Sequence, residues 1–302
     1  MRRRFHTLDV FTETPFAGNP LAVVLDCDGL TPARMQQIAR EFALSETAFV
    51  LPPRDPVNSA RIRIFTPKSE LPFAGHPTIG SAILIAQLEA AEFLSSEDLS
   101  IVIEEEIGTI SCTVRQRKGR AARAEFILPQ LPDRIDAALN VEQLAAALGI
   151  EPGSIGFDGH EPSIYSCGNA FVFVPVDTLE TIGRASPRFP QYADAMPSQT
   201  AKVYVYTRDV EQKGSAFHAR MFAPSLGIPE DPATGSAAAA FAGVLREFEE
   251  PYDGEHSFII EQGYEMGRPS LITLTLDIVK GRLASAMIGG AAVRVSEGEI
   301  DA

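Results

Sequence analysis

The sequence predicts an α+β protein of two pseudo-symmetric halves, each a curved sheet or barrel wrapped around a central apolar helix. The first observation is an echo, because F-A-G-H-P-T-I-G-S-A at 73–82 and P-E-D-P-A-T-G-S-A at 229–237 share a proline, a glycine three residues later, and Ser-Ala. The second is that each copy leads into a segment that is apolar all round, 81–88 and 237–245, which is typical of a buried helix. The third is that strand patterns surround both segments.

Further features recur in the same order around each echo. Gly-Asn turns at 18–19 and 168–169 lead into short apolar strands, and the strand patterns R-I-R-I-F-T-P and H-A-R-M-F-A-P end just before the echoes. Isoleucine-rich strands at 101–110 and 258–268 follow the two helices. Self-similarity of this kind is the sequence signature of repeated structural units. We therefore expect an N-terminal half at 1–120, completed by a C-terminal strand at 285–302, and a C-terminal half at 121–284.

Two amphipathic helices are also predicted. The segment 31–42 offers Thr31 as N-cap with Pro32 directly after it, and the segment 140–149 ends in a C-capping glycine. The basic stretch 115–123 is either the seam between the halves or a charged hairpin turn within one of them. The alternating segment 287–300 predicts a strand that has no analogue at the end of the first half.

Composition narrows the class of partner. The chain has 302 residues and a formal net charge of −14, which argues against a nucleic-acid partner because phosphate binding needs a basic field. No stretch approaches 18 consecutive apolar residues, and no apolar segment follows the basic N-terminus, so neither a membrane span nor a secretory signal is expected. We expect a cytoplasmic protein whose three isolated cysteines are buried free thiols. The five scattered histidines lack metal-ligand spacing, so no metal site is expected.

The two echoes suggest a binding site for an anion. A helix start exposes unpaired N–H groups and a partial positive charge, and glycine lets a ligand approach that backbone closely. Aligning the two prolines places Gly80 opposite Gly235. Each half would then contribute one helix start, and the two helix starts would face one small anionic substrate. The alternative is that glycine and alanine serve only tight packing of helix on sheet. A nucleotide-binding P-loop is excluded, because Ser81 and Ala82 stand where the motif needs lysine and a hydroxyl residue.

Glu46 is the candidate acid/base. It lies in A-L-S-E-T-A-F-V, directly before an apolar strand, where a carboxylate gains little from packing. If the end of that strand opens onto a cleft, Glu46 is partly desolvated and suited to proton transfer. The alternative is a capping or solvent-facing glutamate. The equivalent place in the second half, before V-Y-V-Y, reads Q-T-A-K and holds no acid, so the repeat predicts one base rather than two.

Taken together, the motifs resemble the PhzF family, the phenazine-biosynthesis isomerase-like proteins with a diaminopimelate-epimerase-like fold. The resemblance rests on D-V-F-T-E-T-P-F-A-G-N-P-L-A-V-V, L-S-E-T-A-F-V, R-I-F-T-P-x-x-E-L-P-F-A-G-H-P-T-I-G-S-A, R-M-F-A-P and E-D-P-A-T-G-S-A, and it runs from about Phe5 to Gly298. It implies two halves with a site in the cleft between them, a homodimer, and isomerase chemistry without a cofactor.

The resemblance also implies roles for individual residues. The catalytic glutamate of the family falls on Glu46, which would shuttle a proton between carbons of a small carboxylate substrate. The remaining positions would bind or polarise that substrate: Ser45, Gly75, His76, Asp231, Gly235 and Ser236. Relatives of the same broad fold that racemise with two cysteines need one thiol at each helix start, and neither start here has one.

Three alternatives remain open on the sequence. A protein of this fold could bind a metabolite without turnover, it could be a true dihydro-hydroxyanthranilate isomerase of phenazine biosynthesis, or it could have a structural or partner-binding role. The last gives no reason for two exposed helix starts in one chain.

Overall fold

The computed structural model describes residues 1–198 and 200–302, and the chain divides into two compact units. Unit 1 comprises residues 1–127 and 289–302, and unit 2 comprises residues 128–288. The divisions therefore lie a few residues beyond those expected at 120/121 and 284/285. The fold class is mixed α+β, as predicted, with each unit built as a sheet around one apolar helix.

Unit 1 is a closed barrel of eight strands. Its ring runs β1-β2-β3-β4-β6-β7-β8-β17 and closes where β17 pairs antiparallel with β1, with Arg2 opposite Asp301. From Gly289 onward, the C-terminal strand is thus part of the N-terminal unit. The eight strands are β1 (Arg2–Val10), β2 (Asn19–Val24), β3 (Glu46–Leu51), β4 (Ala60–Phe65), β6 (Leu99–Glu105), β7 (Gly108–Arg115), β8 (Ala122–Ile127) and β17 (Arg282–Asp301), and the short β5 (Glu70–Leu71) pairs with β4.

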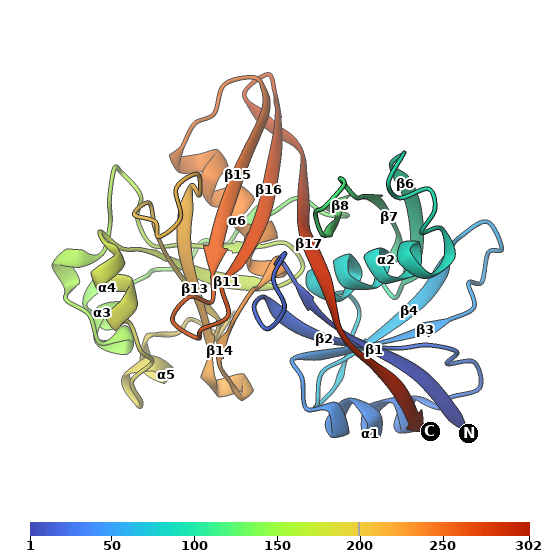
Figure 1. Cartoon of the computed structure of the whole chain (residues 1–302). Coiled ribbons are helices and arrows are strands. Elements are labelled where there is room, and N and C mark those ends of the chain that lie inside the picture. The colour runs from blue at the N-terminus through green and yellow to red at the C-terminus, as the bar shows by residue number, and fades with distance from the viewer. Residues whose placement is uncertain (199) are drawn as a thin grey trace. The chain divides into compact units, whose positions relative to one another are not determined.

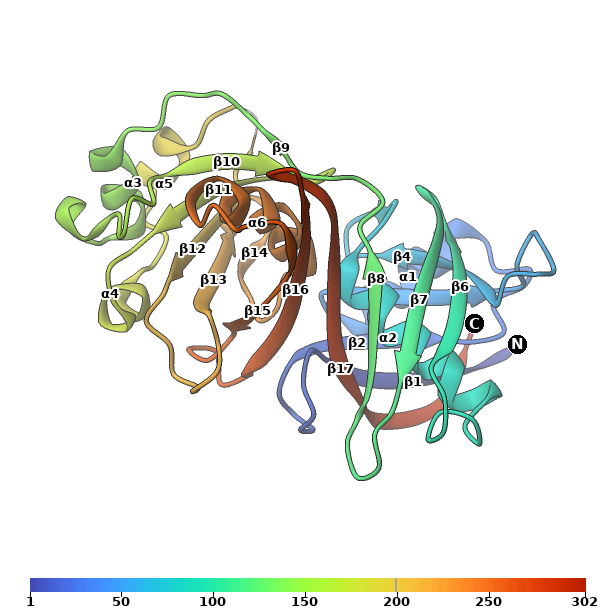
Figure 2. The ribbon, with the colours of Figure 1, turned by 90° about the horizontal axis from the view of Figure 1, so that it is seen from above.

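Helix α2 (Gly75–Glu89) fills this barrel. Its residues are buried from Gly75 to Ala86, and it packs against the barrel strands on both sides, as Figures 1 and 2 show. Gly80 permits a close approach, because a Cβ atom there would lie 2.6 Å from Leu21 Cδ2. The apolar character that predicted a buried helix is confirmed, and it follows from the helix having sheet all around it.

Unit 2 repeats the plan around α6 (Gly235–Phe248), which is buried from Ala237 to Leu245 and packs on β10, β11 and β16. Its ladders are β10–β11 antiparallel, β11–β12 parallel, β12–β13 antiparallel, β13–β15 parallel and β15–β16 antiparallel. The strands are β9 (Asp133–Arg134), β10 (Ser163–Ser166), β11 (Ala170–Pro175), β12 (Val203–Thr207), β13 (Phe217–Ala223), β14 (Ile228–Asp231), β15 (Gly254–Gln262) and β16 (Ser270–Val279).

The remaining helices lie outside these sheets. In unit 1, α1 (Pro32–Phe42) has Thr31 as its N-cap, as predicted. In unit 2, α3 (Val141–Leu148) is capped by Asn140 and ends at Gly149 in the left-handed conformation, also as predicted. Unit 2 further holds α4 (Leu179–Arg184), α5 (Gln191–Ala195) and the short 3₁₀ helices η1 (Pro152–Ser154) and η2 (Pro224–Leu226).

The basic stretch 115–123 is the turn of a hairpin. Strands β7 and β8 pair antiparallel on either side of it, with Arg115 opposite Arg123. The chain passes to unit 2 only after β8. The hairpin turn is therefore the correct interpretation of this stretch. Its arginines and Lys118 lie in a solvated loop and not in a linker between the units.

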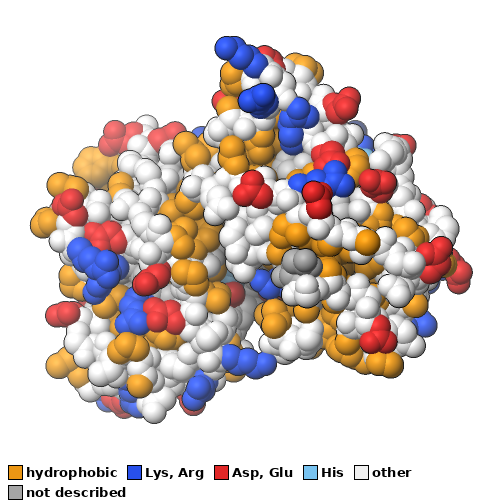
Figure 3. Space-filling model, turned by 180° about the vertical axis from the view of Figure 1, so that it is seen from behind, with side chains coloured by type: hydrophobic (Ala, Val, Ile, Leu, Met, Phe, Trp, Pro, Cys, Tyr) orange, Lys and Arg blue, Asp and Glu red, His pale blue; other side chains and the backbone are white. Residues whose placement is uncertain are grey.

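Two of the three cysteines are buried, as expected. Cys27 and Cys112 are fully enclosed free thiols, whereas Cys167 is half-exposed, and this last point corrects the prediction for that residue. Within the described residues no helix is long and apolar enough to cross a membrane. On the face shown in Figure 3, acidic and basic side chains are interspersed.

Candidate active site

The start of α2 presents unpaired backbone donors. Ala74 is the N-cap in an extended conformation and offers no capping side chain, and the first helical bond is donated by Thr78 N to Ala74 O at 3.2 Å. Among the described residues no protein group accepts from the N–H of Gly75 or of His76. Pro77 has no N–H, so these two groups are the donors that the first turn leaves for an anion.

Glu46 lies beside this helix start. It is the first residue of β3, and its Oε2 is 3.5 Å from Nε2 of His76. The Glu46 side chain is 17% exposed and that of His76 is 5% exposed. The Glu46 side chain is therefore partly shielded from water. Ser45, the residue before it, is half-buried in the bend that precedes β3.

The imidazole of His76 is neutral at physiological pH. Burial lowers the pKa of His76 to about 3, because the charged ring would lose its hydration inside the barrel. The contact with Glu46 is therefore not a salt bridge between full charges. A neutral ring offers one donor and one acceptor nitrogen, so His76 can orient a carboxyl group without fixing it in the ionised form. This is the environment that a group exchanging protons with a substrate needs.

Unit 2 has its own helix start, with Asp231 beside it. Ala237 N and Ala238 N donate to the Thr234 carbonyl, and among the described residues no backbone carbonyl accepts from the N–H of Gly235 or Ser236. Asp231 is 8% exposed at the end of β14, and its Oδ2 accepts from Thr234 Oγ1 at 2.5 Å.

The side-chain amide of Gln262 connects Asp231 to Thr234, the N-cap residue of α6. Its Nε2 donates to the Asp231 carbonyl at 2.7 Å and to Thr234 Oγ1 at 3.1 Å, while its Oε1 accepts from Thr234 N at 3.1 Å. The amide thus fixes the N-cap residue and the backbone of Asp231 at once. Neither Gln262 nor Thr234 was predicted as a site residue. The signal for Gln262 lay in the repeat, since E-E in the strand after the first helix becomes E-Q after the second.

The alignment of the two echoes by their prolines is wrong in register. Gly235 is the first residue of α6, whereas Gly80 is the sixth residue of α2 and lies deep in the barrel. The structural counterpart of Gly235 is Gly75. Gly80 is present because Leu21 and Val10 leave no room for a Cβ atom, which is the packing role that the sequence left as the alternative. The predicted site residues Gly75 and Gly235 are nonetheless the two that begin helices.

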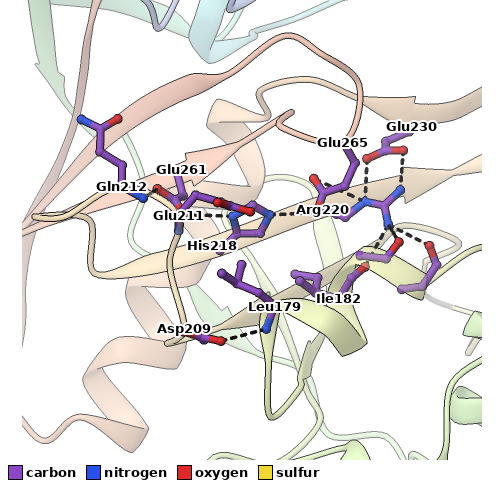
Figure 4. A network of polar contacts seen from close by, with 12 residues as sticks. Leu179, Ile182, Asp209, Glu211, Gln212, His218, Arg220, Glu230, Glu261 and Glu265 are labelled. Atoms are coloured by element: carbon purple, nitrogen blue, oxygen red, sulfur yellow. Dashed lines mark hydrogen bonds and ion pairs between the residues drawn. The ribbon is translucent and has the colours of Figure 1, made fainter.

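A network of ion pairs and hydrogen bonds joins β13 to β14 and β15 near the start of α6 (Figure 4). His218 Nδ1 lies 2.9 Å from Glu261 Oε1, and His218 Nε2 lies 3.0 Å from Glu265 Oε1. Arg220 donates two bonds of 2.8 Å to Glu230 and further bonds to the carbonyls of Ile182, Gly183 and Ala185. Glu230 precedes Asp231, and Glu261 precedes Gln262, so the network holds the two strands from which these residues extend.

The charge state of the network follows from its contacts. Burial lowers the pKa of His218, but the hydrogen bonds to Glu261 and Glu265 outweigh burial and raise the pKa to about 9. Burial alone would raise the pKa of both carboxyls, yet their bonds to His218 leave both pKa values below the usual range. His218 is therefore an imidazolium held between two glutamates, which is a structural role.

Tyr204 is a further neighbour of Asp231. Its hydroxyl is fully buried, has no hydrogen-bond partner among the described residues, and belongs to β12. Burial, and after it the charge of Asp231, raises the pKa of Tyr204. The described residues contain no group of three or more His, Cys, Asp or Glu that could hold a metal ion.

The predicted residues therefore fall into two groups. Unit 1 brings together Ser45, Glu46, Gly75 and His76, and unit 2 brings together Asp231, Gly235 and Ser236. Each group joins a helix start with two free N–H donors to an acidic residue. The two differ in chemistry, since one carboxylate contacts a neutral imidazole and the other contacts a threonine hydroxyl.

Comparison with known proteins identifies the family. The sequence model of PhzC-PhzF, phenazine biosynthesis-like protein, matches residues 8–298. An uncharacterized isomerase of Mesorhizobium japonicum is 49% identical over 99% of this chain and 98% of that protein. The trans-2,3-dihydro-3-hydroxyanthranilate isomerase of Pseudomonas aeruginosa is 32% identical over 98% of both chains. The crystal structure of a Bacillus anthracis phenazine biosynthesis protein of the PhzF family superposes with a TM-score of 0.89, at 28% identity and with full coverage of both chains. The chain belongs to the PhzC-PhzF family of phenazine biosynthesis-like proteins.

Proposed function

We propose that this protein is an isomerase that needs no cofactor and moves a proton between carbons of a small carboxylate-bearing metabolite, with Glu46 as the acid/base. The observation that carries the proposal is the contact of Glu46 with the neutral His76 beside two free N–H donors at the start of α2. The names of the relatives, which are isomerases, agree with this reaction class.

Each residue then has a defined task. The N–H groups of Gly75 and His76 bind a substrate carboxylate, and Glu46 removes a proton from a nearby carbon and returns it to another. His76 donates or accepts a hydrogen bond and so keeps the Glu46 carboxyl in place through both protonation states. Ser45 binds substrate next to Glu46. In unit 2, Asp231, Gly235 and Ser236 form a second candidate group for binding polar groups of a small molecule.

The substrate class follows from the free N–H pairs, which suit anions of small size. The relative from Pseudomonas aeruginosa is named for trans-2,3-dihydro-3-hydroxyanthranilate, which carries one carboxylate. That compound is one candidate for this chain, and other small carboxylates are equally compatible with the donors described. The expected cytoplasmic location and homodimer belong to the same proposal.

Turnover and affinity measured on the same variants test the proposal. The purified protein is incubated with trans-2,3-dihydro-3-hydroxyanthranilate and with a panel of small carboxylates, and new isomers are followed by NMR. We expect Glu46→Gln to lower kcat at least 10²-fold while affinity for the substrate changes little. Glu41→Gln, an exposed glutamate on α1, is the matched control and keeps full activity.

A second measurement separates an isomerase from a metabolite-binding protein. Mild denaturation of the purified protein followed by mass spectrometry identifies any ligand it retains. A retained carboxylate that wild type binds tightly and never converts would favour the binding protein and contradict the proposed reaction.

A further inference from the structure

Two adjacent glutamates at the end of β6 have opposite environments. The side chains of neighbouring residues in a strand point to opposite faces of the sheet. Glu104 accepts hydrogen bonds from Asp55 N, Asn58 Nδ2 and Arg54 N, which lower its pKa to about 2. Glu105 instead points toward the first turn of α2, is 7% exposed, and has its Oε1 2.6 Å from Thr78 Oγ1.

Thr78 has one hydroxyl hydrogen and two oxygen atoms within hydrogen-bond distance, one of them on Glu105. Thr78 Oγ1 also lies 2.8 Å from the carbonyl oxygen of Ala74, the N-cap of α2. A carbonyl oxygen only accepts and a hydroxyl has a single hydrogen, so Thr78 cannot donate fully to both Ala74 O and Glu105 Oε1. A proton on Glu105 satisfies both contacts, because Thr78 then donates to Ala74 while it accepts from the Glu105 carboxyl.

The second oxygen of Glu105 agrees with this assignment. Oε2 is buried and has no hydrogen-bond partner among the described residues. A neutral carbonyl oxygen in that place costs far less free energy than half of a carboxylate would. Burial raises the pKa of Glu105 to about 8.

Among the residues that the structure describes, no positive charge acts on Glu105 to offset its burial. Thr78 is the polar group that faces Glu105 from α2, and on β7 the titratable group is the thiol of Cys112. The pKa of Cys112 is itself raised to about 12 by burial and by Glu105, so this thiol carries no charge at neutral pH either. Across β4, the parallel ladder pairs Ala60 with Ile103 and adds no charged group on this face.

Unit 2 uses a permanently neutral group in the corresponding place. In the parallel ladder of unit 1, Arg61 pairs with Glu104 and Glu105 follows; in unit 2, His218 pairs with Glu261 and Gln262 follows. Gln262 donates from its amide to Thr234 Oγ1 at the start of α6. Gln262 is thus a neutral donor to the N-cap threonine of α6, as a protonated Glu105 would be to Thr78 in the first turn of α2.

We propose that Glu105 is a positioning residue kept as a neutral carboxylic acid, whose proton locks Thr78 and Ala74 and thereby orients the N–H groups of Gly75 and His76. When Glu105 ionises, the donor to Thr78 is lost and a negative charge arises beneath the two N–H groups that bind an anion. The site accordingly fails at alkaline pH. The statement that these N–H groups bind an anion rests on the proposed function. The protonation state of Glu105 and its hydrogen bonds are independent of that function.

Carboxyl NMR tests the protonation state directly. In protein labelled with ¹³C at glutamate side-chain carboxyls, we expect one resonance that is still protonated at pH 7 and is absent from Glu105→Gln. Glu104→Gln is the matched control and removes a resonance that is already ionised at pH 4. If Glu105→Gln fails to fold, Thr78→Val assigns the same resonance by shifting it. A Glu105 carboxyl that is ionised at pH 6 overturns the proposal.

The positioning role has a separate readout. The ¹H–¹⁵N shifts of the Gly75 and His76 amides should follow a titration near pH 8 in wild type and stay flat in Glu105→Gln, whereas a purely structural role leaves both proteins alike. Identical curves in the two proteins overturn the positioning role. Because these measurements need no substrate, loss of the proposed isomerase activity and failure of this inference are distinguishable.

Discussion

Replacing His218 by glutamine is expected to destabilise the protein at neutral pH and hardly at all at alkaline pH. His218 is 1% exposed in its side chain and lies between Glu261 and Glu265, whose side chains are 0% and 22% exposed. Glutamine retains hydrogen-bonding capacity of similar size but carries no positive charge. The variant therefore leaves two carboxylates facing each other without a cation between them.

The magnitude follows from the pKa of His218. It is about 9 in the folded protein against an ordinary value of 6.5, and one pKa unit corresponds to about 1.4 kcal/mol. The charged form thus contributes about 3 kcal/mol to the free energy of unfolding. Because the folded pKa is raised, this contribution is complete below pH 6.5 and disappears as the pH rises through 9. Breaking a buried ion pair by removing one partner costs a similar amount, about 3–5 kcal/mol.

Urea unfolding followed by circular dichroism measures the difference. At pH 6 we expect His218→Gln to lower the free energy of unfolding by about 3 kcal/mol, and at pH 10 by less than about 1 kcal/mol. Arg184→Gln is the control, because its pair with Glu180 is exposed and should change stability by no more than about 0.5 kcal/mol at either pH. An equal loss for His218→Gln at pH 6 and pH 10 would refute the assignment of the imidazolium.

Three further predictions concern other parts of the molecule. Gly80→Ala should destabilise by about 1–3 kcal/mol in urea melts because its Cβ would meet Leu21, whereas Gly183→Ala, in open space on α4, should stabilise slightly. Glu105→Gln should gain stability over wild type by about 1.4 kcal/mol per pH unit between pH 4.5 and 8, since the folded wild type holds a proton that the unfolded chain releases; parallel curves would contradict this. Thiol reagents at pH 7 should leave activity intact, because burial raises the pKa of all three cysteines to about 11 or 12, and rapid inactivation would show otherwise.

Much of the fold was predictable because its signals are local or repeated. The helix caps at Thr31, Asn140 and Gly149 are side-chain and backbone preferences that act within a few residues. The two central helices were predictable from their lack of a polar face, which only a helix enclosed by sheet tolerates.

The register between the repeats was not predictable from the echo. Identical letters at Gly80 and Gly235 serve different needs, one a close approach of Leu21 and the other the first turn of a helix. An alignment scores the two glycines as a match. Only the residues at which the helices begin distinguish their roles. The counterpart of Gly235 is Gly75, five residues earlier in its motif.

The supporting residues of the site were missed for a related reason. Glu105, Gln262 and the His218 network act across strands that are distant in sequence, and their effect depends on burial and on proton counts that the sequence does not show. Glu46 was predicted from its place directly before an apolar strand, and the family motifs gave roles to His76 and Asp231.

Deuterium transfer to carbon is the most direct test of Glu46 as the acid/base of an isomerase. The protein is incubated in D₂O with trans-2,3-dihydro-3-hydroxyanthranilate and the panel of small carboxylates, and deuterium at carbon is followed by NMR in wild type, Glu46→Gln and Glu41→Gln. We expect wild type and Glu41→Gln to introduce deuterium at a carbon of at least one compound and Glu46→Gln to do so at least 10²-fold more slowly. Equal rates of exchange in wild type and Glu46→Gln would contradict it.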